Sequence, residues 1–196
     1  MALEGLQLMR APTCLAALVL AGTAGAEPMT YAIDQVHSQV HASVLHMGMS
    51  NSTARFEIKD GSITADSADW NAAKVAATLD IAGISLGDDT WQEHVSASKW
   101  FDVASFPEAR FVSTRVERTG DQMLAIHGDL TLKGTTKPVV LQARINHAGP
   151  HPMSKQPALG ISASGSLKRS EFGISEYLGS ISDEVQLRIE IEAKAG

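Results

Sequence analysis

Strict alternation of apolar and polar residues constrains the fold of this chain more than any other feature. The clearest case is segment 185–192, VQLRIEIE, in which every odd position is apolar and every even position is polar. Successive side chains of a β-strand point to opposite faces, so this period of two predicts a strand with one buried face.

The same period recurs along the chain from Thr30 onwards. Turn signals separate the segments: Asp60-Gly61, the TGD of 119–121, the KGT of 133–135, and the loop 149–157 with its three prolines. The alternating segments are 36–44, 56–58, a strand that begins at Ile63, 74–81, 110–117, 123–132, 139–147 and 159–167. Eight to ten strands with short connections predict an all-β antiparallel barrel or sandwich.

Small residues are frequent on the apolar faces of these strands. In a sandwich they would let two sheets pack closely, whereas in a barrel of about eight strands they would leave room for one small or elongated ligand. The alternation is compatible with both folds. The small residues are Ala42, Ala77, Ala143, Ala163 and Gly165.

One segment, 88–107, breaks the pattern. Asp88, Asp89 and Thr90 are capping residues, and Glu93 follows Thr90 by three positions, which predicts a capping box and a short helix. Trp91 and Val95 would share one face of that helix, with His94 beside them. Two of the three tryptophans and two of the five phenylalanines lie in this segment. We therefore expect it to close one end of the barrel.

The N-terminus predicts export. Residues 15–22, LAALVLAG, form a short apolar run before the small-residue site Ala24-Gly25-Ala26, so residues 1–26 are predicted to be a cleaved signal peptide and 27–196 the folded domain. Met9 offers a better start than Met1, because residues 1–8 carry Glu4 and no positive charge. Cys14, the only cysteine, precedes the apolar run, so we expect neither lipid anchoring nor disulfides.

Several motifs together resemble the YceI family over the whole of 27–196. They are Tyr31-x-Ile33-Asp34, His37-Ser38, His46-Met47-Gly48, Trp100-Phe101-Asp102, Phe106-Pro107, Phe111-x-Ser113-Thr114, the run from Gly128 to Val139, and Arg169-x-x-Phe172-Gly173-Ile174. The resemblance implies a lipocalin-like barrel of about eight strands with a helical segment. It also implies a periplasmic protein that binds a polyisoprenoid or a similar apolar chain in its lumen.

The chain departs from the family pattern in two places. Ala54 stands where the family has glycine, and Trp91 and Ser96 replace arginines that often flank the helix histidine. Without those arginines, a neutral head group such as an isoprenoid quinone would suit this protein better than a pyrophosphate. That preference is a hypothesis.

The predicted ligand-binding residues come from the alternating faces and from the closing segment. His94 is equally compatible with a hydrogen bond to the polar end of a ligand and with simple exposure. The lumen residues are Val40, Val44, Leu79, Phe111, Ile161 and Ile189, and the lid residues are Trp91, His94, Trp100 and Phe101.

The sequence offers little for catalysis or metal binding. His37 and His41 would lie about 13 Å apart along one strand face, too far to share an ion, and His46 would point to the other face. The Gly-x-Ser-x-Gly spacing occurs once, at 83–87, but no residue pattern beside its serine marks an activating base, and the serine-rich string 162–166 lies within a strand pattern. Arg169, with Lys168 and Glu171, could line the mouth, but a surface ion pair is the favoured interpretation. We therefore expect no catalytic residues, no metal and no cofactor.

The predicted function is a periplasmic carrier for a polyisoprenoid or quinone-like lipid, without catalysis. Two alternatives stay open: a hydrolase or other enzyme acting on such a lipid, and a structural or stress-response protein with a filled barrel. The net charge of −6 argues against nucleic acid. Transient membrane contact and a homodimer are both compatible with the sequence.

Overall fold

The alternating segments form β-strands in the computed structural model, which describes residues 27–196. The predicted signal peptide, 1–26, lies outside the described residues. The strands are β1 (Met29–Ile33), β2 (Gln39–His46), β3 (Ser50–Asp66), β4 (Asp69–Ser85), β5 (Glu108–Arg118), β6 (Met123–Leu132), β7 (Thr135–Pro150), β8 (Pro157–Lys168) and β9 (Glu184–Ala195). Between them lie the helix α1 (Asp89–Ser96) and the 3-10 helix η1 (Arg169–Phe172).

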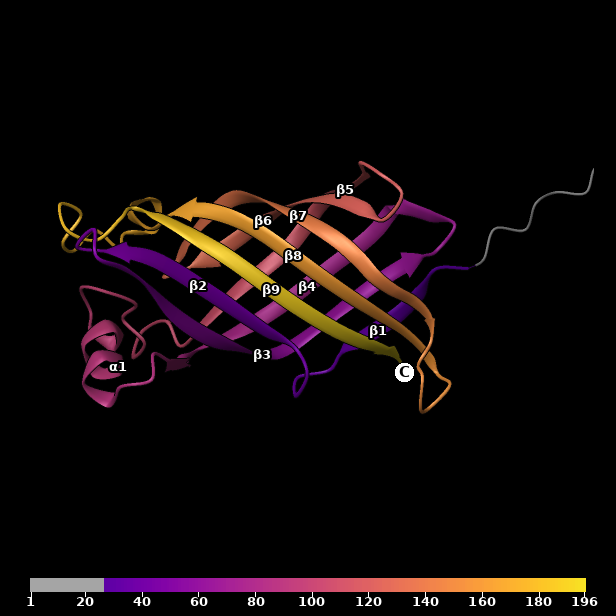
Figure 1. Ribbon diagram of the computed structural model, residues 1–196, viewed down its shortest axis with the longest axis horizontal. Coiled ribbons are helices and arrows are strands. Elements are labelled where there is room, and N and C mark those ends of the chain that lie inside the picture. The colour runs from indigo at the N-terminus through magenta and orange to yellow at the C-terminus, as the bar shows by residue number, and fades with distance from the viewer. Residues whose placement is uncertain (1–26) are drawn as a thin grey trace, which may run out of the picture.

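Eight of these strands close into a barrel (Figure 1). The antiparallel order runs β3-β2-β9-β8-β7-β6-β5-β4, and pairing of β3 with β4 completes the ring. The ninth strand, β1, lies in line with β2, because both pair with β3 and with β9. The predicted barrel with a short helical insertion at one end is confirmed, and the sandwich alternative is excluded.

The predicted turn at Asp60-Gly61 was wrong, because β3 continues through both residues for 17 residues in all. Instead, the register of β3 against β4 shifts between Ile58 and Asp60, as a β-bulge does. A Cβ atom at Gly61 would lie 2.6 Å from Ile33 Cδ1 and 3.0 Å from the Ala76 carbonyl. Glycine is needed here for close approach within the sheet rather than for a turn.

The helix begins two residues earlier than a capping box at Thr90 requires. Asp88 is its N-cap, and the Asp88 carboxylate accepts a hydrogen bond from the Trp91 backbone N–H at 3.0 Å. The predicted capping box of Thr90 and Glu93 was therefore wrong, although Asp88 was correctly identified as a capping residue. No residue of α1 is fully buried, so this helix covers the barrel end, with half-buried Val95 packed against the core.

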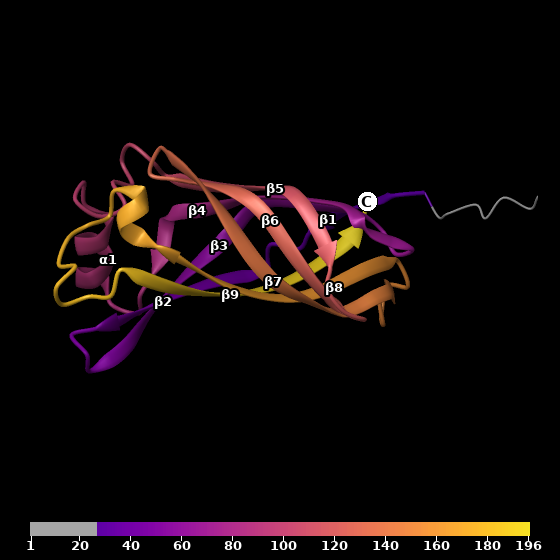
Figure 2. The same ribbon diagram turned by 90° about the horizontal axis from the view of Figure 1, so that it is seen from above.

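The two ends of the barrel differ. Helix α1, segment 97–107, η1 and loop 173–183 gather at one end, which we call the α1 end, and the opposite end carries the β3–β4 and β5–β6 turns (Figures 1 and 2). Buried side chains fill the opposite end: Trp70, Val116, Leu124, Ile145 and Leu159.

Candidate functional site

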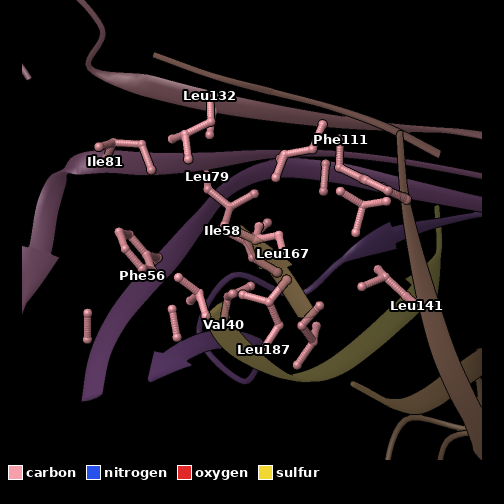
Figure 3. A pocket seen from close by; sticks show the side chains of 18 of the residues that line it. Val40, Phe56, Ile58, Leu79, Ile81, Phe111, Leu132, Leu141, Leu167 and Leu187 are labelled. Atoms are coloured by element: carbon pink, nitrogen blue, oxygen red, sulfur yellow. The ribbon is translucent and has the colours of Figure 1, made fainter. Parts of the chain in front are cut away.

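A cavity of about 250 Å³ lies inside the barrel, where apolar side chains of several strands point toward one another (Figure 3). Its lining includes Val95 and Trp100, so it extends to the α1 end. It is lined by 34 residues, of which all but Ser52 and Arg169 are apolar. The lining comes from all the strands of the ring and from the segment after β4, where Leu86, Val95, Trp100 and Phe101 face inward. Such a cavity suits an apolar ligand, because it offers almost no polar partner.

Side-chain size explains why the barrel is hollow here. Ala42, Ala77 and Ala163 line the cavity, as the barrel interpretation predicted for small residues on the inner face. Ala143 and Gly165 do not line it. Ala143 is fully buried, and a Cβ atom at Gly165 would lie 2.9 Å from Leu141 Cδ2, so these two positions serve close packing instead.

Eight of the ten predicted ligand-binding residues line the cavity, which tests their position but not ligand binding itself. They are Val40, Val44, Leu79, Trp100, Phe101, Phe111, Ile161 and Ile189. The strand residues were found because alternation fixes which side chains share the inner face. Alternation also extends to Leu187 and Val185, which line the cavity beside Ile189 and were not singled out.

Trp91 and His94 are not among the lining residues. Trp91 is 40 % exposed and packs edge-on against His46, with ring centroids 5.7 Å apart. His94 is exposed and lies against Trp100 and Tyr177, at 5.7 Å and 6.5 Å. Val95 is the α1 residue that faces the lumen, and Trp91 lies one helical turn away from it, over the β2–β3 hairpin.

The favoured interpretation of Arg169 as part of a surface ion pair was wrong. Its side chain is only 4 % exposed, and within residues 27–196 it forms no ion pair. The guanidinium donates hydrogen bonds to the carbonyls of Ser182, Ile174 and Ile181, at 2.9, 3.0 and 2.9 Å.

The Trp100 ring completes the surroundings of this cation, with its centroid 5.5 Å from Arg169 Cζ. Burial lowers the pKa of the Arg169 guanidinium, and the negative charge of Asp183 partly offsets that effect. Arg169 thus ties loop 173–183 to the barrel beside the cavity. The neighbouring Phe172 is fully buried, and an aromatic residue at this position is the sequence signal that could have indicated inward packing of the segment.

The described part of the chain shows no constellation for other chemistry. Residues 27–196 contain no group of three or more histidines, cysteines or acidic residues placed to hold a metal ion. Within the same range, every helix is too short or too polar to cross a bilayer. The apolar cavity is therefore the feature of residues 27–196 that bears on function.

Comparison with known proteins agrees with this architecture. The sequence model described as the YceI-like domain matches residues 31–193. The chain belongs to the YceI family. A curated relative, Protein YceI of Salmonella arizonae, is 35 % identical over 178 residues, which is 90 % of this chain and 92 % of that protein.

Solved structures of YceI-like barrels align with most of the chain. The Campylobacter jejuni YCEI protein is 28 % identical, with a TM-score of 0.69, over 77 % of this chain and 89 % of that one. Burkholderia cenocepacia BcnA has a TM-score of 0.73 at 24 % identity, over 83 % and 99 %. A polyisoprenoid-binding domain from Saccharophagus degradans has a TM-score of 0.65 at 14 % identity, over 86 % and 99 %. The last two comparisons concern the fold alone.

Proposed function

We propose that this protein holds a polyisoprenoid or an isoprenoid quinone-like lipid in its barrel and carries it without chemical change. The observation that carries the proposal is the cavity, whose lining is apolar except for Ser52 and Arg169. A filled barrel would lack this space. Membership of the YceI family and the polyisoprenoid-binding neighbour of the same fold point in the same direction.

Burial of the apolar chain supplies the affinity. At about 25 cal/mol per Å², removing about 300 Å² of apolar surface from water contributes about 7 kcal/mol before the costs of association. A chemical reaction would need polar groups at the reacting atoms, and the cavity offers only one hydroxyl and one guanidinium that is already hydrogen-bonded three times. Binding without catalysis is the function that this site supports best.

The polar end of the ligand is proposed to be neutral. Trp91 and Ser96 stand where related proteins often have arginines, and the guanidinium of Arg169 is occupied by three backbone carbonyls. An anionic head group would thus meet a single cation in the cavity, Arg169, three of whose five N–H groups are already bonded to carbonyls, whereas a neutral quinone ring costs less to bury than an anion. We place the carrier in the periplasm on the basis of the signal peptide predicted for residues 1–26.

The test is native mass spectrometry of the mature protein purified from the periplasm, followed by organic extraction and identification of what is bound. We expect a co-purifying prenyl lipid with a neutral head group. A prenyl pyrophosphate in its place would contradict the head-group assignment. A ligand-free mass that does not change after incubation with prenyl quinones and prenyl alcohols of several lengths would contradict the carrier function.

A further inference from the structure

Exposed apolar side chains gather at the α1 end of the barrel. Of the twelve large apolar residues exposed in the described part of the chain, six lie here and are 40–84 % exposed. We call these six the apolar rim: Leu45, Met47, Met49, Trp91, Tyr177 and Leu178. Isolated exposed apolar residues are ordinary on a protein surface, but a group confined to one end indicates an interaction surface.

Three separate segments contribute to the apolar rim, and direct contacts hold them together. The β2–β3 hairpin is joined to loop 173–183 by hydrogen bonds from the Met47 N–H to the Ser180 carbonyl, at 2.6 Å, and from the Ser182 N–H to the Leu45 carbonyl, at 3.0 Å. Helix α1 is joined to the same hairpin by the contact of Trp91 with His46. Figure 2 shows the hairpin, α1 and the loop projecting at the same end. The rim is therefore one surface.

This surface adjoins the cavity. Val44, which lines the cavity, precedes Leu45 on β2, and Val95 lies one turn after Trp91 on α1. The Trp100 ring, also part of the lining, stacks on Tyr177 with centroids 6.3 Å apart. Each segment that presents the rim to solvent is thus continuous with, or packed on, a residue that faces the lumen.

Two rim residues are held in a backbone conformation that disfavours them. Met47 has φ of 53° and Tyr177 has φ of 54°, in the left-handed region that glycine and asparagine occupy more readily. Met47 is at the tip of the β2–β3 hairpin, followed by Gly48 with φ of 68°. An apolar side chain at an exposed, strained turn position is unfavourable for folding alone, so its presence points to a role in contact.

The charges near the apolar rim indicate which kind of lipid surface the rim can contact. Segments 45–51 and 177–182 contain no Asp, Glu, Lys or Arg, so burying them removes no such charge from water. The flanking helix carries the exposed acids Asp88, Asp89 and Glu93. These acids would be repelled by an anionic lipid surface, whereas a zwitterionic surface carries no net charge to oppose them.

We propose that the apolar rim inserts into the interfacial layer of a zwitterionic phospholipid membrane, with the α1 end of the barrel facing the lipid. Trp and Tyr are residues that favour this layer, since each has an apolar ring and a polar tip. The proposal rests on the proposed function, because it gives the bound lipid a path between membrane and cavity that avoids water.

Flotation with phosphatidylcholine vesicles tests the contact. We expect the mature protein to float with these vesicles, and to bind less when phosphatidylglycerol is included. In the triple variant M47S/M49S/L178S, the partition coefficient should fall about tenfold or more, because each buried side chain contributes in proportion to the apolar area that it removes from water. The control variant V36S/M123S/M153S changes three exposed apolar residues outside the rim and should bind as the wild type does.

Tryptophan fluorescence locates the contact. Trp91 is 40 % exposed, whereas Trp70 and Trp100 are 5 % and 8 % exposed, so brominated phosphatidylcholine should quench the emission of Trp91 selectively. The substitution Trp91→Phe should abolish the quenching and leave flotation intact. Quenching that survives in Trp91→Phe would overturn the placement of the rim.

Three other results would overturn the proposal: no flotation of the wild type, binding that requires phosphatidylglycerol, or equal loss of binding in both triple variants. Lipid retention is measured separately, by native mass spectrometry of protein loaded in detergent. The variant M47S/M49S/L178S should retain a loaded prenyl quinone but exchange it with vesicles more slowly than the wild type. Failure to retain any prenyl lipid would contradict the proposed function, whereas retention without vesicle binding would contradict only the membrane contact.

Discussion

Arg169 shows how one side chain can organise the end of a barrel. Its fork of N–H groups meets three carbonyls from the segment that follows η1, and the Trp100 ring covers it on the side of the closing segment. A methionine of similar length would fill the same space but could satisfy none of the three carbonyls. The polar contacts of Arg169 are therefore structural, and its role beside the cavity is to fix the loop.

We predict that Arg169→Met lowers the free energy of unfolding by about 3–5 kcal/mol, because three carbonyls lose charged donors in a buried site. Urea denaturation of the mature protein measures the change. The control is Arg188→Met, which removes an exposed ion pair with Glu190 and should cost less than about 1 kcal/mol. Equal losses in the two variants would show that Arg169 acts as an ordinary surface residue.

At the residue scale, the sequence predicts what depends on strand periodicity and misses what depends on contacts between distant segments. Val40 and Ile189 follow from alternation alone, and they face each other in register on β2 and β9. The partners of Arg169 are 5 to 13 residues away along a loop without periodicity, so no local pattern reveals them. A related reason explains why Trp91 and His94 do not line the cavity: helical spacing predicts which residues share a face but not which face packs against the barrel.

Among the elements, β1 and β2 together occupy the place of one strand between β3 and β9. The interruption between them is built by Asp34, whose carboxylate accepts hydrogen bonds from the backbone N–H groups of Val36 and His37, at 3.0 and 3.2 Å. The same carboxylate accepts a hydrogen bond from Lys194 Nζ of β9, at 2.8 Å. Asp34 therefore connects the end of β1 to the C-terminal strand.

This connection should be sensitive to acid. The Lys194 hydrogen bond, followed by that of His37, holds the pKa of Asp34 well below its ordinary value. A carboxylate with a depressed pKa in the folded state stabilises the fold above the pKa of the unfolded chain, about 3.9 for Asp, and this stabilisation is lost as the pH falls further.

We predict that Asp34→Asn costs about 1 kcal/mol at neutral pH and that the difference from wild type shrinks steadily below about pH 4. Thermal unfolding across that pH range measures it, with the exposed Asp121→Asn as the control. A difference that stays constant down to about pH 2 would show that the lost side-chain geometry, and not the charge, is responsible.

Element boundaries were predicted well where a turn is local. The TGD and KGT signals both fall between paired strands, β5–β6 and β6–β7. The signal at Asp60-Gly61 also contains glycine but lies inside β3, where Ile33 and Ala76 from other strands occupy the space beside Gly61. A glycine in the sequence indicates that a side chain is not tolerated at that position. It does not show whether the reason is a turn or close packing against neighbouring strands.

Across the whole molecule, the barrel is packed at one end and hollow at the other. Ala143 and Ala163 show the contrast, since they are paired in register on β7 and β8. Ala163 lines the cavity, whereas Ala143 is fully buried and does not. Replacing alanine with leucine should therefore affect ligand binding at position 163 and stability at position 143.

We predict that Ala163→Leu projects into the cavity, reduces the lipid bound per protein molecule, and changes the free energy of unfolding by less than about 1 kcal/mol. Ala143→Leu should instead overpack the core and cost about 1–3 kcal/mol. Native mass spectrometry and urea denaturation measure the two effects. Full lipid occupancy in Ala163→Leu would mean that the ligand does not use this space.

The packed end has a consequence for how the container can be used. Trp70 and its buried neighbours close the cavity at the end opposite α1, so under the proposed function a chain that enters at the α1 end has to leave at the same end. A bound lipid would therefore have to dissociate before a second one could bind. The volume of about 250 Å³ would also limit how much of a prenyl tail the cavity holds, and any further length would stay outside at the α1 end. Under the proposed function, two lipids would therefore have to compete for entry at the same end of the barrel.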